Sequence, residues 1–282
     1  MNHKEYYSFL IRTYSDEFPE ELEYKDWRDL AALAFDCEST GLPPDQDPDW
    51  NDPVAVQAFH EACEAVKVLQ VCLTLVKDGT DKDATPQVID TVTFLVNPGI
   101  PIDKVIAEKS HKITDEMVAD AKPFSEYVSV IEDFVNRADI AFAFNGRADY
   151  NFLNLEFARL GHGTLDTAKL PVIDPLPFER SYTKMKRWPY NLFTVAKRYA
   201  VAKSGRVAHA FDAAHQASVD VEMLYELVFK MSKNTQIIPW DLGDAIKKQS
   251  VLSIEHEEYF EKGRQRKLAK AAKTSSVEVD SE

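Results

Sequence analysis

The sequence predicts an α/β fold in which a mixed central β-sheet is flanked by helices on both faces. Two observations support this prediction. Three strand-like segments come early, and the second and third, residues 68–76 and 88–96, are joined by the turn DGTDKD (78–83), as in a hairpin. Later in the chain, strand-like segments alternate with helical ones, as they do where helices pack on a sheet.

The early elements follow from local composition. The apolar run AALAFD (31–36) is typical of a central strand. Residues 43–53 are rich in Pro and Asp and predict a loop, and the pattern of residues 54–66 is helical. The segments 68–76 and 88–96 are rich in β-branched residues, which favour strands.

The later elements follow from periodicity. Thr114 is expected to cap a short helix with its side chain. Phe124, Val128 and Ile131 recur at helical spacing within 124–137. The remaining expected elements are a strand at 138–144, a helix at 149–161, a strand at 170–174, a helix at 191–200, a mobile approach at 202–215 and a final helix at 216–232.

The chain divides into a main domain with two appendages. We expect a helical N-terminal arm at 1–30, the main domain at 31–233 with an insertion at 45–66, and a helical or flexible tail at 234–282. The tail contains a basic run at 262–273 before an acidic end, and such a run is more often a solvated helix end than a phosphate site. The insertion is expected to lie over the cleft that binds substrate.

Composition excludes some classes of protein. The net charge of −14 argues against holding long nucleic acid by bulk charge, so affinity must come from metal ions, a local basic patch or a partner. No apolar stretch approaches the roughly 18 to 20 residues that span a bilayer. The N-terminus lacks a secretory pattern, and the 3 cysteines form no CxxC pair. These features favour a reduced, cytoplasmic location.

Two acids end the first strand. Asp36 and Glu38 in FDCESTGL are two positions apart, so their side chains share one face of a strand, about 6.5 to 7 Å apart along the chain. Two carboxylates in a dry place raise each other's pKa unless a cation compensates them. Oxygen ligands of this kind suit Mg²⁺ or Mn²⁺. The alternative is a strand end at the surface with two solvated acids.

Three further residues stand at the ends of elements. Asp149 follows the strand at 138–144 and starts a helix, where an aspartate more commonly caps the helix or interacts with its dipole than acts in catalysis. His215 and Asp220 are five positions apart at the start of the last helix, and Asp220 lies beside its apolar stripe. Each of these residues taken alone has an ordinary structural explanation. His209 and Asp212 are interpreted as loop residues.

Together, the residues fall in the order D-x-E, D, H-x4-D, and here the chain resembles the DnaQ-like 3′→5′ exonucleases of the DEDDh type. This family has the ribonuclease H-like fold and includes the proofreading epsilon subunits of bacterial DNA polymerase III. FDCESTGL, FNGRADYNFL and HQASVDVEML resemble its three motifs, and NPGIPID with SHKITDEMV and VIDPLPFER with NLFTVAKRY are softer matches. The resemblance covers about residues 31–233.

The resemblance implies a two-metal mechanism acting on 3′ ends of DNA, with nucleoside 5′-monophosphates as products. Two Mg²⁺ or Mn²⁺ ions would be held by the four acids Asp36, Glu38, Asp149 and Asp220. His215 would take the proton of the attacking water as general base. Substrate contacts are expected from Thr40, Gly41 and Leu42, and as lesser candidates from Asn145 and from Phe152, for which core packing is at least as plausible.

Several points stay open at this stage. The second motif departs from the family pattern at Phe144 and Ala148. Neither position is a metal ligand in the family, so the departure puts only the nucleotide contacts in doubt. Relatives that degrade short RNA, similar to oligoribonuclease and ribonuclease T, use the same five residues, and a non-catalytic interaction module is a third reading. QSVLSI (249–254) loosely resembles a sliding-clamp peptide that would link the tail to a DNA polymerase, but it also suits a helix face.

Overall fold

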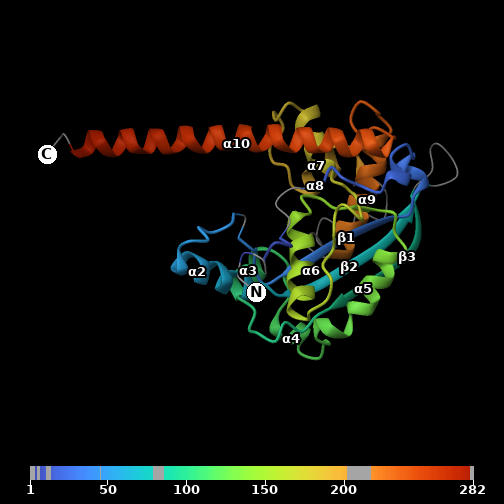
Figure 1. The fold of residues 1–282 in the computed structure, drawn as a ribbon, viewed down its shortest axis with the longest axis horizontal. Helices are drawn as coiled ribbons and strands as arrows, with labels where there is room; N and C mark the ends of the chain where they lie inside the picture. The colour runs from blue at the N-terminus through green and yellow to red at the C-terminus, as the bar shows by residue number, and fades with distance from the viewer. Residues whose placement is uncertain are drawn as a thin grey trace.

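The computed structural model describes residues 4, 7–10, 14–44, 46–78, 86–201 and 217–279, with side chains in the last segment described as far as residue 266. The described part is built on one five-stranded sheet in the order β3-β2-β1-β4-β5 (Figure 1). Its strands are β1 Ala32–Ser39, β2 Val68–Lys77, β3 Gln87–Leu95, β4 Ile140–Phe142 and β5 Val172–Ile173. The sheet is mixed, because β1–β2 and β2–β3 are antiparallel while β1–β4 and β4–β5 are parallel.

The helices cover both faces of this sheet, as the sequence predicts (Figure 1). They are α2 Pro53–Glu64, α3 Lys104–Lys109, α4 Asp115–Val118, α5 Val128–Asn136, α6 Arg147–Arg159, α7 Pro175–Tyr182, α8 Leu192–Arg198, α9 Ala217–Ser232 and α10 Leu242–Val279. Short 3₁₀ turns lie at Glu20–Leu22, Trp27–Asp29 and Phe124–Glu126. Among the helices of the described ranges, none is both long and apolar enough to cross a membrane.

Alternation along β1 separates two hydrophobic cores. Ala32 and Ala34 pack in the core beneath α8 and α9, whereas Leu33 and Phe35 pack in the core beneath α5 and α6. Because side chains alternate along a strand, the next even-numbered residues, Asp36 and Glu38, continue the face that is covered by α9. The sequence pattern therefore fixes the side of the sheet on which these acids lie.

Three elements differ from the sequence expectation. Helices α3 and α7 were not predicted: α3 is too short for a periodic pattern, and the prolines of α7, Pro175 and Pro177, resemble a turn. Both prolines stand in the first turn of α7, where a missing N–H is tolerated, and Asp174 caps that helix by accepting a hydrogen bond from Leu176 N at 2.9 Å. The predicted side-chain cap at Thr114 is wrong, since Thr114 occupies the N-cap of α4 without such a bond.

The start of the C-terminal helix belongs to the packed body. In α10, Leu242, Ala245 and Ile246 are buried in the same core as Trp27 of the N-terminal arm. The arm also contacts the segment just before this helix, since Trp27 donates its ring N–H to Pro239 O at 2.7 Å. The C-terminal turns of α10 extend away from the body (Figure 1).

The clamp-like peptide lies in this packed part of α10. Gln249 is 2% exposed and Leu252 is 9% exposed. Gln249 donates to Val172 O at 2.9 Å and accepts from Asp174 N at 2.7 Å, so its amide pairs with the open edge of β5. These contacts favour the helix-face interpretation of QSVLSI over the clamp-binding one.

Candidate active site

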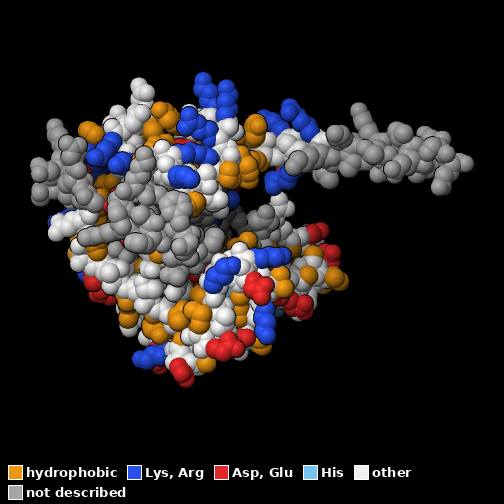
Figure 2. Space-filling view, turned by 180° about the vertical axis from the view of Figure 1, so that it is seen from behind, with side chains coloured by type: hydrophobic (Ala, Val, Ile, Leu, Met, Phe, Trp, Pro, Cys, Tyr) orange, Lys and Arg blue, Asp and Glu red, His pale blue; other side chains and the backbone are white. Residues whose placement is uncertain are grey.

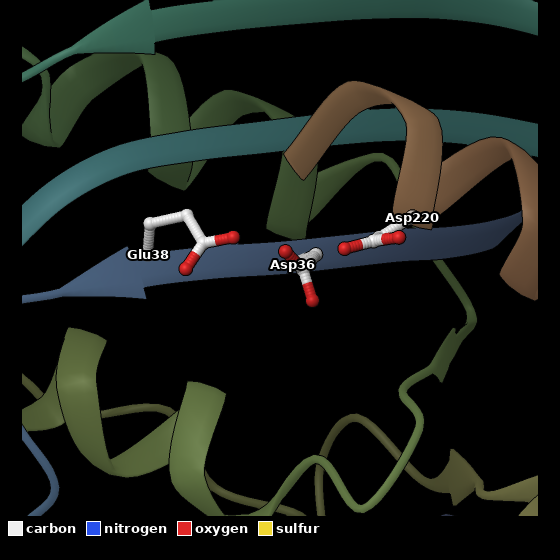
Figure 3. Close-up of side chains that lie close together, drawn as sticks. All are labelled: Asp36, Glu38 and Asp220. Atoms are coloured by element: carbon white, nitrogen blue, oxygen red, sulfur yellow. The ribbon is translucent and has the colours of Figure 1, made fainter. Parts of the chain in front are cut away.

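Three carboxylates converge between β1 and α9 (Figure 3). Asp36 and Glu38 come from β1, and Asp220 comes from the first turn of α9. One oxygen from each residue lies within 4.8 Å of the others. The sequence predicted these three as metal ligands, and the structure brings them together.

The strand register holds the helix in place over these acids. Glu38 lies opposite Gln70 of β2, and Gln70 Oε1 accepts a hydrogen bond from Ala217 N at 3.1 Å. This bond ties the start of the described part of α9 to the sheet three residues before Asp220. The relative position of the acids therefore depends on a backbone N–H at a helix start, which would otherwise be unsatisfied.

Asp149 lies beside the three acids and is bound to their strand. Strand β4 pairs with β1 only at residues 32–34, so the edge of β1 is open farther along, where α6 begins. Cys37, between the two β1 acids, donates its N–H to Asp149 Oδ1 at 3.0 Å. Asp149 is 8% exposed and thus adds a fourth buried carboxylate next to the cluster.

Burial and mutual repulsion raise the pKa of every β1 acid. Desolvation raises the pKa of Asp36 well above its ordinary value, and Asp149, Asp220 and Glu38 raise it further. Burial, with the charges of Asp220 and Asp149, raises the pKa of Glu38 to about 8. Burial also raises the pKa of Asp149 to about 7, although its hydrogen bonds to backbone N–H groups lower it.

This donor set fits a divalent metal. Ionising several carboxylates side by side in a buried place is costly, so without positive charge nearby the acids retain protons near neutral pH. Hard cations such as Mg²⁺ and Mn²⁺ prefer carboxylate oxygens. The cluster is therefore suited to hold at least one such ion.

The expected substrate residues lie in different settings. Thr40 Oγ1 donates to Ala65 O at 2.7 Å, so this side chain holds the loop to the end of α2. Gly41 O accepts a hydrogen bond from Ser39 Oγ at 2.7 Å, and Leu42 is 76% exposed next to it. Asn145, with a left-handed φ of 55°, turns the chain from β4 into α6. Phe152 is 4% exposed within a hydrophobic core, and its surroundings give no support to substrate contact.

The predicted general base lies outside the described residues. His215 falls in the segment 202–216, as do His209, Asp212 and the predicted mobile approach. Its role therefore remains a prediction.

Sequence reasoning missed an acid behind the cluster. Asp174 is 3% exposed, accepts a hydrogen bond from Tyr14 OH at 3.0 Å and influences the pKa of Asp149. Burial raises the pKa of Asp174, although hydrogen bonds from Leu176 N and Asn145 N lower it. The signal was the Asp-Pro step in VIDPLPFER, which is typical of a helix cap. Asp174 thus connects the N-terminal arm, α7 and the loop before Asp149.

Comparisons with known proteins agree with this arrangement. A family model described as exonuclease matches residues 33–228. The DNA polymerase III epsilon subunits of Pasteurella multocida (strain Pm70) and Haemophilus influenzae (strain ATCC 51907 / DSM 11121 / KW20 / Rd) are 29% and 30% identical to the chain over 137 residues. Each match takes 49% of this chain and 50% of the relative, so the chain spans about half the length of the curated relatives it matches.

Solved structures share the fold. The nuclease domain of 3′hExo, a DEDDh family member bound to rAMP, has a TM-score of 0.51 and 15% identity, over 74% of this chain and 93% of that one. A full-length 3′-exonuclease has a TM-score of 0.51 and 15% identity, over 76% of this chain and 84% of that one. At these identities the likeness concerns the fold alone, and it confirms the ribonuclease H-like architecture.

Proposed function

The chain belongs to the exonuclease family, as a DnaQ-like 3′→5′ exonuclease of the DEDDh type, and we propose that it removes nucleotides from single-stranded or mismatched 3′ ends of DNA. The products are nucleoside 5′-monophosphates. The observation that carries this proposal is the convergence of Asp36, Glu38 and Asp220 within 4.8 Å, next to buried Asp149.

The residues divide the chemistry among them. The three converging acids and Asp149 would hold two Mg²⁺ or Mn²⁺ ions, which supply positive charge to the phosphate and lower the pKa of the attacking water. The Cys37 N–H fixes the Asp149 carboxylate in place. His215 accepts the proton of the water as it attacks, and the exposed Leu42 offers an apolar surface to the terminal base.

The substrate and partner are part of the proposal. The similarity to two epsilon subunits favours DNA and a proofreading role beside a DNA polymerase. Short RNA is the second candidate, because a net charge of −14 suits substrates that need few phosphate contacts. We also infer a cytoplasmic location from the three cysteines, which are buried and free of disulfide bonds.

A degradation assay tests the reaction and ranks the substrates. 5′-labelled single-stranded DNA and RNA of one sequence are incubated with Mg²⁺, Mn²⁺ or EDTA. We expect a ladder that shortens from the 3′ end, requires metal and disappears in Asp36→Ala and His215→Ala. The ratio of the DNA and RNA rates chooses between proofreading and RNA turnover.

Matched controls are the half-buried Asp90 and the exposed His162, both away from the cluster. Asp90 lies on the edge strand β3 and His162 follows α6. Asp90→Asn and His162→Ala should retain full activity. If neither polymer is cleaved in any metal, the catalytic proposal fails and a non-catalytic interaction module takes its place.

A further inference from the structure

A cleft of about 800 Å³ lies between α7, the start of α6 and α10. Asn145 and Arg147 line it, and they precede Asp149 by four and two positions along the chain. Its α10 wall, within residues 253–264, falls outside the segment matched by the exonuclease family model. The cleft thus begins beside the candidate active site and is completed by an element beyond the family domain.

Two buried polar atoms of residues that line this cleft have no hydrogen-bond partner among the described residues. They are Arg180 Nε and His256 Nδ1, and His256 is only 6% exposed. Burial, together with the charge of Arg180, lowers the pKa of His256 to about 4, so the ring is neutral at pH 7. Because buried polar atoms normally have partners, Arg180 and His256 are lining residues whose polar groups the described part of the chain leaves unsatisfied.

The chemistry of the walls combines cations with an aromatic ring. The Arg180 guanidinium lies 5.1 Å from the ring centre of Phe260. The other cations of the cleft are held in exposed ion pairs: Arg147 with Glu257 at 3.2 Å, Lys262 with Glu258 at 3.2 Å and Arg264 with Glu261 at 2.7 Å. Exposed pairs contribute little, so a phosphate can replace the glutamate.

A basic and aromatic loop continues this surface beyond Arg180. The Arg180 guanidinium is 5.8 Å from the Tyr190 ring, and the Trp188 ring centre is 5.9 Å from the same ring. Trp188 is 73% exposed, and residues 180–201 contain no Asp or Glu. Figure 2 shows that Lys and Arg side chains gather around the base of α10, while Asp and Glu lie mainly on the lower part of that face.

We propose that the cleft and the loop at 183–191, between α7 and α8, bind the single-stranded nucleic acid that leads to the 3′-terminal nucleotide. Phosphates would contact Arg180 and Arg264, and bases would stack on Phe260 and Trp188, as in other single-strand sites. The acids Asp47 and Asp174 also line the cleft, which limits it to a few phosphates. This proposal rests on the proposed function and gives α10 a role in substrate binding.

Binding is tested first, in EDTA, so that the result is independent of catalysis. Fluorescence anisotropy measures the affinity of labelled dT12 and rU12 as salt is varied. We expect Arg180→Ala and Arg264→Glu to weaken binding about 5- to 10-fold. Loss of one phosphate contact should also reduce the slope of log Kd against log salt by about 0.7. Arg264 is exposed, so its variant stays informative if Arg180→Ala is poorly folded.

Lys247→Ala is the matched control, because Lys247 lies on α10 but pairs with Glu23 outside the cleft. Equal binding by the wild type and both cleft variants would overturn the proposal. A second readout separates the cleft from the acids: hydrolysis of thymidine 5′-monophosphate p-nitrophenyl ester should be unchanged in both variants, while KM for dT12 rises and that for dT2 does not. If the wild type cleaves neither the ester nor dT12 in any metal, the proposed function is refuted and the binding result still stands.

Discussion

At the scale of the residue, the four acids are held in place by backbone geometry. Asp36 and Glu38 share a face because β1 stays regular through both, and its register shifts only after Glu38. The Cys37 N–H then binds Asp149 from the open edge of the strand. The protein thus gathers carboxyl groups where the backbone holds them fixed, which makes the site pre-organised for a cation.

Removing one acid should relieve repulsion and lose the metal. We expect Asp36→Asn to abolish cleavage and to unfold at a higher temperature than the wild type in EDTA. Wild-type protein should gain about 2.7 kcal/mol when Mg²⁺ is present at 100 times its dissociation constant, and the variant should gain almost nothing. Thermal unfolding with EDTA and with Mg²⁺ measures both effects. An equal Mg²⁺ shift in the variant would exclude Asp36 as a ligand.

The raised pKa values predict that the metal-free protein loses stability as pH rises. The folded pKa of Glu38 is about 8 and that of Asp149 about 7, both above their unfolded values near 4. Between about pH 4 and pH 8 the folded state therefore binds more protons than the unfolded state. Each extra proton makes the unfolding free energy fall by about 1.4 kcal/mol per pH unit.

Urea unfolding in EDTA at pH 5, 6, 7 and 8 measures this dependence. Glu38→Gln should show a shallower decline than the wild type, because the amide does not titrate. Stability that is independent of pH in the wild type would show that the acids are ionised in the folded protein without metal.

The site was only partly predictable from sequence, for physical reasons. Asp36, Glu38 and Asp220 could be predicted because alternation along a strand and the start of a helix constrain where they point. Asp174 and Tyr14 could not, since their hydrogen bond joins segments 160 positions apart and has no local signature. Phe152 is the opposite case: its place in a motif suggested a substrate contact, but its ring is buried in the core.

At the scale of the element, the fold depends on how the short strands end. The predicted strands at 138–144 and 170–174 shorten to Ile140–Phe142 and Val172–Ile173, because neighbouring strands and tertiary contacts, which local composition does not encode, decide where pairing stops. The open edge of β5 is then satisfied by the Gln249 amide of α10. The Gln249 side chain thus makes hydrogen bonds at this edge that a neighbouring strand would otherwise make.

Loss of the Gln249 amide should lower the stability of the protein. We expect Gln249→Ala to lower the unfolding free energy by about 1 to 3 kcal/mol, since it leaves a buried backbone N–H and C=O without partners. Urea unfolding measures the loss, with the exposed Lys247→Ala as a control that should change stability little. A loss no larger than that of Lys247→Ala would mean that water can satisfy the β5 edge.

At the scale of the whole molecule, the two ends of the chain form one structure. Leu242 N donates to Lys25 O at 2.9 Å, and the Arg28 guanidinium stacks on the Trp240 ring at 3.6 Å. The sequence suggests appendages at both ends, because neither segment carries one of the exonuclease motifs and each has a composition unlike that of the main domain. Their mutual packing depends on contacts across more than 200 positions, which no local pattern reveals.

Truncation tests whether the predicted domain at 31–233 is autonomous. A chain ending at residue 233 loses Leu242, Ala245, Ile246 and Leu252 from the core. Burial of these side chains contributes roughly 6 kcal/mol or more, comparable with the total stability of about 5 to 15 kcal/mol of a typical protein. We therefore expect residues 1–233 to be unfolded, whereas residues 1–266 should unfold with the cooperativity and midpoint of the full chain. Circular dichroism during thermal unfolding distinguishes the two, and a stable, cooperative 1–233 fragment would show that α10 only rests on a complete domain.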